Sequence, residues 1–239
     1  MIPRGVRSRA TAALMAALAL AAPAAAASRA RPVVVELFTA QGCAACPQAN
    51  ALLQELSRRK GVVALTFPVD VWDYLGWQDT FAKPDYTARQ KAYVARFKLR
   101  ELYTPEMVVG GRRETLGFDR EKVTALIDKD APPSRPRVSF SPQETGVQVG
   151  AGPAAGGAAD VWLVRYDPME RTVKVRTGEN KGKTVVEQNV VRELLRLGGW
   201  TGRARSYRLP ATEDATLKTV VLVQGAKGGP ILAAAQAKS

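Results

Sequence analysis

The chain has 239 residues, of which 46% are hydrophobic, and a formal net charge of +13 from 35 Lys and Arg against 22 Asp and Glu. It contains no histidine, which excludes Ser-His-Asp and Cys-His catalysis and every histidine-based zinc or copper site. The basic residues are scattered without a nucleic-acid-binding motif, so nucleic acid is not an expected partner. Chemistry must use cysteine, carboxylate, lysine or tyrosine side chains, or backbone groups.

The first 27 residues have the pattern of a secretory signal peptide. Arginines within the first nine residues precede an apolar run over 12–22, and the small residues 24–27 offer A-x-A cleavage sites. The apolar run is short for a membrane-spanning helix, so an uncleaved membrane anchor is the less favoured alternative. We therefore predict an exported, periplasmic protein and set residues 1–27 apart from the fold.

Residues 31–130 alternate between strand and helix patterns. The first strand is a near-continuous apolar run from Val33 to Phe38, which favours a buried parallel strand. Apolar residues at helical spacing follow, and Gly61 ends that helix. Gly110 and Gly111 predict a hairpin turn. The predicted order is β-α-β-α-β-β-α, with strands over 33–38, 62–67, 107–109 and 112–116 and helices over 49–56, 85–99 and from 119 onward.

The proline-rich stretch 131–136 predicts a stiff linker between two domains. After it, short strand patterns recur between turns rich in glycine and proline, as in an antiparallel sandwich or open sheet. We therefore expect residues 137–239 to form a β-rich, antiparallel companion domain. Residues 190–197 fit a strand or a short helix. The other expected strands cover 138–140, 146–149, 160–166, 171–177, 206–209, 219–224 and 231–234.

Cys43 and Cys46, the two cysteines of the chain, lie between the first predicted strand and the first predicted helix. A pair at this spacing cannot connect distant elements, so it indicates a local redox or metal pair. The unpaired N–H groups and the dipole at a helix start stabilise a thiolate and lower its pKa. Cys43 is therefore the predicted nucleophile, and Cys46 is the resolving thiol that releases a mixed disulfide. An inert structural disulfide is the alternative.

Thr104 and Pro105 precede the third predicted strand. In the thioredoxin fold, a cis-proline at this place faces the cysteine pair and leaves a backbone edge to which a substrate peptide adds as a strand. We expect Thr104 to make that contact. The alternative is an ordinary trans-proline at the beginning of an edge strand.

A carboxylate and an aromatic stretch complete the candidate site. Glu36 interrupts the apolar first strand, and a buried carboxylate there would have a raised pKa and accept the proton of Cys46. The slightly favoured alternative is that it points to an edge or pairs with a basic residue. The aromatic stretch follows the second strand, at the sheet end where ligands bind in open α/β sheets. It is expected to line a substrate groove or to cover the core, and its residues are Trp72, Asp73, Tyr74 and Trp77.

Spaced motifs carry a family resemblance. They read Glu36-Leu37-Phe38-Thr39-x-Gln41-Gly42-Cys43-x-x-Cys46-Pro47, Val69-Asp70-x-Trp72-Asp73-Tyr74-Leu75-Gly76-Trp77 and Tyr103-Thr104-Pro105-x-Met107-Val108-Val109. In these motifs the chain resembles a family of secreted bacterial proteins with a thioredoxin-like fold, classed as a domain of unknown function. The resemblance covers nearly all of 31–235, and in the second half it includes Gly178-Glu179-Asn180-x-Gly182 and Asn189-Val190-Val191-Arg192.

The resemblance implies a fold and an envelope location, without a substrate. It supports carrying the site over to Cys43, Cys46 and Pro105. Relatives commonly have histidine where this chain has Pro68, so any role of that histidine cannot operate here.

The sequence favours an exported thiol–disulfide oxidoreductase that needs no cofactor. Its expected partners are periplasmic protein thiols or disulfides and a redox partner protein, and the direction of electron flow stays open. One alternative is a copper(I) chaperone, because two thiolates suit Cu(I), although the chain lacks the Met-Thr that precedes the metal loop it resembles. Another is a non-catalytic binding module on a thioredoxin scaffold. No metal is assigned to the site.

Overall fold

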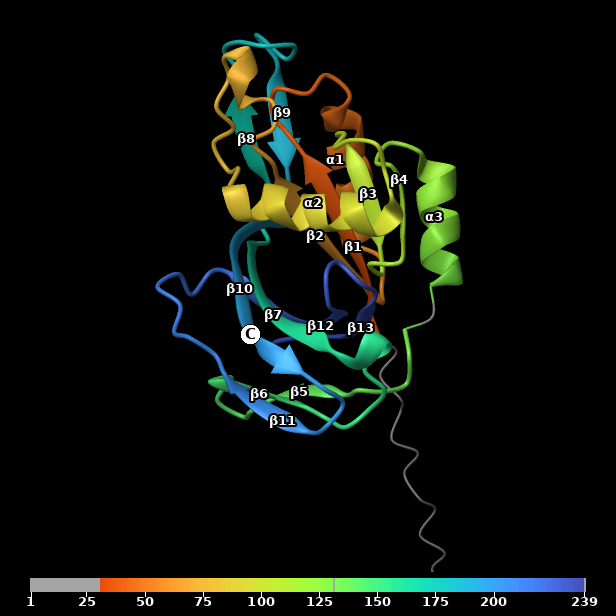
Figure 1. The fold of residues 1–239 in the computed structure, drawn as a ribbon. Helices are drawn as coiled ribbons and strands as arrows, with labels where there is room; N and C mark the ends of the chain where they lie inside the picture. Colours follow the sequence, from red (N-terminus) through yellow and green to blue (C-terminus); the bar gives the residue numbers. More distant parts are fainter. Residues whose placement is uncertain (1–30, 131, 239) are drawn as a thin grey trace, which may run out of the picture.

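The computed structural model describes residues 31–130 and 132–238 (Figure 1). The predicted leader, residues 1–27, lies outside the described residues. The elements of the first half follow the predicted order, with a short 3₁₀ helix added after the second strand. They are β1 (Val33–Thr39), α1 (Cys46–Ser57), β2 (Val62–Pro68), η1 (Asp73–Leu75), α2 (Pro84–Phe97), β3 (Glu106–Val109), β4 (Arg113–Leu116) and α3 (Arg120–Lys129).

The second half is built of strands, as the sequence predicts. Residues 190–197, which fitted two structures, belong to a long strand. One strand, β9, has no counterpart among the expected ones. The elements are β5 (Val138–Phe140), β6 (Gly146–Val149), η2 (Ala155–Gly157), β7 (Ala159–Asp167), β8 (Arg171–Lys174), β9 (Thr184–Glu187), β10 (Val190–Trp200), β11 (Arg205–Arg208), β12 (Lys218–Gly225) and β13 (Ile231–Gln236).

The expected companion domain requires a correction, because strands from both halves share one sheet. That sheet is mixed and has the order β13-β12-β7-β10-β2-β1-β3-β4. β10 runs parallel to β2 with Val190 opposite Thr66, and the Thr66 N–H donates a 3.0 Å hydrogen bond to the Asn189 carbonyl. The edge of β2 that β1 leaves free is therefore covered by β10, which removes an exposed row of backbone donors and acceptors.

Two smaller antiparallel sheets accompany the central one. One has the order β11-β6-β5 and packs against β7, β12 and β13 through a separate apolar core that contains Trp200. The other is the β8–β9 hairpin, which lies beside α1 at the end of the central sheet where α1 begins (Figure 1). This hairpin belongs to the second half of the chain and reaches the cysteine pair of the first.

β1 is buried along its whole length because helices cover both of its faces. Side chains of Val35 and Leu37 pack with α1 and α3, whereas Val34 and Phe38 pack with Tyr86 and Tyr93 of α2. This explains the near-continuous apolar run, since a strand with two covered faces has no polar side. Within the described residues, no helix is long and apolar enough to cross a membrane.

Candidate functional site

A disulfide joins Cys43 and Cys46 at the end of β1. Helix α1 begins at Cys46 with Ala45 as its N-cap residue, so Cys43 lies in the turn just ahead of the helix. Cys46 is fully buried, whereas Cys43 keeps 6% of its surface exposed and is followed by exposed Ala44 and Ala45. The small part of the pair's surface that is exposed therefore belongs to Cys43.

Thr104 and Pro105 lie against this turn, and the peptide bond between them is cis. The Thr104 carbonyl oxygen is 3.7 Å from the Cys43 Sγ. The Trp72 indole N–H donates a 2.7 Å hydrogen bond to the Thr104 Oγ1. Residues from three separate motifs are thus connected through Thr104, which contacts both the Cys43 sulfur and Trp72.

The loop between β8 and β9 closes the site from the second half of the chain. Asn180 is fully buried, and its Nδ2 donates hydrogen bonds of 2.9 Å to the Gln41 carbonyl and 2.7 Å to the Cys43 carbonyl. The neighbouring Glu179 is exposed, and its carboxylate accepts a 3.0 Å hydrogen bond from the Ala44 N–H. Sequence reasoning found this segment only as part of the family resemblance.

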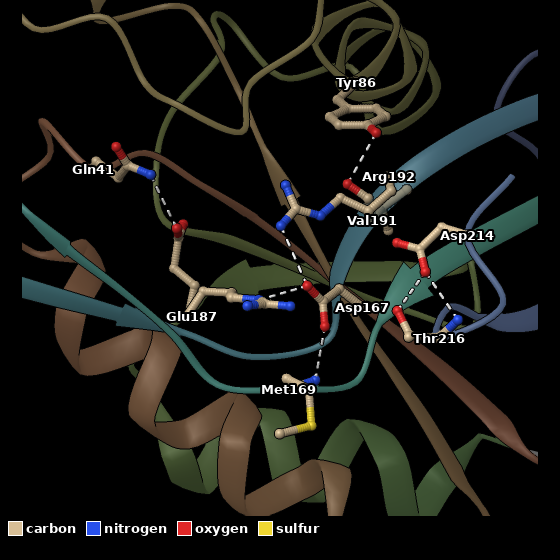
Figure 2. Close-up of polar contacts among 10 residues, drawn as sticks. Gln41, Tyr86, Asp167, Met169, Glu187, Val191, Arg192, Asp214 and Thr216 are labelled. Atoms are coloured by element: carbon tan, nitrogen blue, oxygen red, sulfur yellow. Dashed lines mark hydrogen bonds and ion pairs between the residues drawn. The ribbon is translucent and has the colours of Figure 1, made fainter.

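Gln41 connects the turn to two buried carboxyl groups that the sequence did not single out. Its backbone N–H donates a 2.7 Å hydrogen bond to Asp79, and its Nε2 donates one of 3.2 Å to Glu187. Figure 2 shows the Glu187 side chain directed toward Gln41. The side-chain amide oxygen of Gln41 accepts hydrogen bonds from Trp77 Nε1 at 3.0 Å and from the Thr80 N–H at 3.2 Å.

Burial makes both carboxyl groups weak acids. It raises the pKa of Asp79 to about 6, against hydrogen bonds from the Gln41 and Phe81 N–H groups that favour the charged form. Burial and, to a smaller extent, the nearby Asp79 charge together raise the pKa of Glu187 to about 8. The two carboxyl groups both lie beside Gln41, and their negative charges repel each other, so the arrangement disfavours the state in which both are ionised.

A further buried carboxyl group follows Pro105. Glu106 accepts a 2.8 Å hydrogen bond from Gln90 Nε2, which also donates to the Tyr103 carbonyl. Burial raises the pKa of Glu106 to about 7. A titratable acid therefore sits directly behind the cis-proline, at the position that the third motif left unspecified.

Glu36 pairs with a basic residue, which was the favoured interpretation of the sequence. Its carboxylate lies 2.7 Å from Arg89 Nε, and it also accepts a hydrogen bond from the Tyr93 hydroxyl. Both members of the ion pair are buried, and the guanidinium lies over the rings of Tyr93 and Trp162. Glu36 thus anchors α2 to β1.

The residues of the aromatic stretch differ in burial: Trp72 and Trp77 support the site, whereas Tyr74 is exposed. Trp72 and Trp77 are half-buried and hold Thr104 and Gln41 through their indole N–H groups. Asp73 accepts a 3.1 Å hydrogen bond from the Asp79 N–H. Tyr74 instead leaves 76% of its surface exposed, with its ring centroid 6.3 Å from that of Trp72. Tyr74 is therefore the member free to contact another molecule.

A second ionic cluster secures the strands that carry the β8–β9 hairpin. Figure 2 shows buried Asp167, at the end of β7, bonded to the Met169 N–H and to Arg192 of β10. Burial opposes its charge, but hydrogen bonds from Arg171, the Met169 N–H and Arg192 hold the pKa of Asp167 below its ordinary value. The base of the hairpin is thereby tied to the central sheet.

A cavity of about 350 Å³ lies between α2 and strands β7, β10 and β12, and no cysteine lines it. Its walls include Arg89, Tyr93, Trp162 and Gln224. Among the described residues, no group of three Cys, Asp or Glu side chains is arranged to hold a metal ion. The cysteine pair and this cavity are thus separate features of the structure.

Comparison with known proteins identifies the family of the chain. A family described as a protein of unknown function (DUF1223) matches residues 34–224. The chain belongs to this family. Curated proteins provide no match.

Solved structures extend the DUF1223 comparison. The crystal structure of protein AGR_C_4864 from Agrobacterium tumefaciens is 31% identical, with a TM-score of 0.71 over 88% of this chain and 95% of that one. HBP35 of Porphyromonas gingivalis is 15% identical, with a TM-score of 0.51 over 88% of this chain and 76% of that one, a likeness of fold alone.

Proposed function

We propose that this DUF1223 protein is an exported thiol–disulfide oxidoreductase that acts on periplasmic protein thiols through Cys43 and Cys46. The observation that carries the proposal is the disulfide itself, which lies next to the exposed residues Ala44 and Ala45, with the Cys43 sulfur 3.7 Å from the Thr104 carbonyl oxygen. A purely structural disulfide would not need to lie at an exposed turn beside the Thr104 carbonyl.

The fold that we propose for the first half is thioredoxin-like. The order β1-α1-β2-α2-β3-β4-α3 supports it, together with the cysteines at the start of α1 and the cis bond before β3. In such a site an extended substrate segment pairs with the free backbone of Thr104, which brings its sulfur to Cys43. The exposed Tyr74 ring supplies an apolar contact beside that segment.

The exchange requires two steps. In the reducing direction, the Cys43 thiolate attacks a substrate disulfide, a Cys43–substrate bond forms, and the departing substrate thiolate takes up a proton. The Cys46 thiolate then attacks the Cys43 sulfur, which releases the second substrate thiol and closes the Cys43–Cys46 disulfide. Two electrons pass to the substrate, and a redox partner protein restores the dithiol. The reverse sequence oxidises a substrate dithiol.

The periplasmic location rests on the leader pattern over 1–27. A compartment without a strong reducing buffer lets a protein disulfide persist, so the cysteine pair can cycle there. Cleavage after the small residues is expected to leave a mature chain that begins close to β1.

Trapping with Cys46→Ser tests the proposal. Removing the resolving thiol should leave mixed disulfides on Cys43, visible as reducible high-mass species whose partners mass spectrometry identifies. The matched control is the Cys43→Ser, Cys46→Ser double variant, which should trap nothing. Cys43→Ser protein that still reduces insulin and refolds a scrambled substrate at the wild-type rate would overturn the proposal.

A further inference from the structure

Glu179 lies beside the cysteine pair although it comes from the second half of the chain. Its position is set by the next residue, because buried Asn180 bonds the carbonyls of Gln41 and Cys43. The loop is also closed on itself by backbone hydrogen bonds of 3.0 Å from Val175 to Lys183 and 2.9 Å from Lys183 to Asn180. Glu179 is thereby held next to Cys43 by buried contacts that do not involve its own carboxylate.

The cysteine turn has no charged residue of its own. Between Glu36 and Glu55 the sequence contains neither acid nor base. Two carboxylates from other parts of the chain bind the backbone of the turn. Asp79 accepts a 2.7 Å hydrogen bond from the Gln41 N–H, and Glu179 accepts one of 3.0 Å from the Ala44 N–H. Asp79 is buried, whereas Glu179 is exposed.

A carboxylate at this N–H has a definite effect on a neighbouring thiolate. The amide groups ahead of a helix are the donors that stabilise an ionised cysteine. When Glu179 occupies the Ala44 N–H, that donor is engaged, and a second negative charge stands one residue from Cys43. Like charges disfavour ionisation, so the thiol pKa rises. A cation on the same loop, Lys183, directs its Nζ to Asn180 Oδ1 at 3.2 Å.

We propose that Glu179 is a positioning residue that tunes the cysteine pair, making the Cys43 thiol less acidic and the disulfide harder to reduce. This inference rests on the proposed redox function. Stabilising the reduced thiolate makes a disulfide a stronger oxidant, and Glu179 acts in the opposite sense. The β8–β9 loop therefore sets the redox character of a pair that belongs to the first half.

Glu179→Gln tests the inference because it removes the charge and keeps the length of the side chain. In a Cys46→Ser background, the pH dependence of alkylation should show the Cys43 pKa lowered by about 0.5–1 unit. In the otherwise wild-type chain, equilibrium with glutathione should shift about three- to tenfold toward the dithiol, which is about 15–30 mV for a two-electron couple. Added salt should shrink both differences, because Glu179 is exposed.

Glu170→Gln is the matched control. Glu170 is also exposed and bonds α1, through Gln54 Nε2 at 2.7 Å, but at a helix position well beyond the cysteines. It should leave the Cys43 pKa and the glutathione equilibrium unchanged. A Glu179→Gln protein that matches the wild type in both measurements, or a Glu170→Gln protein that shifts equally, would overturn the inference.

These measurements need no substrate protein, so the two proposals fail separately. If Cys46→Ser traps partners while Glu179→Gln changes nothing, the tuning is wrong and the oxidoreductase stands. If Glu179→Gln shifts the equilibrium as stated but nothing is trapped and Cys43→Ser keeps full activity, the tuning stands and the oxidoreductase proposal is wrong.

Discussion

Asn180 follows Cys43 by 137 residues, yet its side-chain amide donates a 2.7 Å hydrogen bond to the Cys43 carbonyl. The same amide nitrogen bonds the Gln41 carbonyl, so one buried side chain fixes both ends of the turn that enters the cysteine pair. The second half of the chain is therefore part of the candidate site.

Asn180→Ala should destabilise the oxidised protein. It leaves two carbonyl oxygens without their donor, and each unpaired buried acceptor costs about 1–3 kcal/mol of the free energy of unfolding. Urea unfolding measures the loss. Lys181→Ala, at the exposed neighbouring position, should stay within about 0.5 kcal/mol of the wild type. Equal stability of the two variants would show that Asn180 does not hold the turn.

Arg89→Met should be among the more destabilising single changes in the first half. It leaves the fully buried Glu36 carboxylate without its cation, and breaking a buried ion pair in this way costs about 3–5 kcal/mol. The double variant Glu36→Leu, Arg89→Met removes both charges and should recover part of that loss. Denaturant unfolding of the wild type, Arg89→Met and the double variant checks this prediction. It is contradicted if the double variant is less stable than Arg89→Met by as much as a second, independent substitution would cost.

The free energy of unfolding should decline with rising pH, and Asp79 and Glu187 contribute to this decline together with Glu106, whose pKa is also raised. Folding raises the pKa of Asp79 and Glu187, to about 6 and about 8, so the folded state holds their protons more tightly. Their contribution is complete below the unfolded pKa values, about 4, and is lost as pH rises through the folded values. Glu187→Gln should flatten the decline in urea unfolding between pH 5 and 8. Glu170→Gln should keep it, and a wild-type profile in Glu187→Gln would exclude Glu187 as a contributor.

Tyr74→Ala should weaken substrate binding while leaving the stability of the fold nearly unchanged. Because 76% of the surface of Tyr74 is exposed, the free energy of unfolding should change by less than about 0.5 kcal/mol. Loss of an aromatic contact worth about 0.5–1.5 kcal/mol should raise KM for an unfolded disulfide substrate about two- to tenfold, with kcat preserved. An unchanged KM would place the substrate elsewhere.

Trp72→Phe should act on the Thr104 side of the site. Phenylalanine keeps a ring in the half-buried position but removes the indole N–H that bonds Thr104 Oγ1. We expect a loss of about 0.5–1.5 kcal/mol in the free energy of unfolding and a slower reaction of Cys43 with a peptide disulfide. Trp162→Phe, on a different part of the sheet, should leave that reaction rate unchanged.

Local pattern explains which elements the sequence predicted. The apolar run of β1, the helical spacing in α1 and the Gly110-Gly111 turn report on residues close in the chain, and the structure has each element where the pattern places it. The placement of Cys43 beside Thr104 agrees with the expectation drawn from the thioredoxin fold, in which a cis-proline before the third strand faces the cysteine pair.

The sequence by itself determined the cysteine pair, the strand and helix order of the first half and the position of Thr104 and Pro105 beside Cys43. Tertiary structure alone decided that β10 joins β2 in one sheet, and that Asn180, Glu179 and Glu187 reach the cysteine turn. The physical reason is that these contacts join backbone and side-chain groups more than 100 residues apart, as in the 137 residues between Asn180 and Cys43. No local periodicity encodes such a pairing, which depends on how the whole sheet closes its free edge.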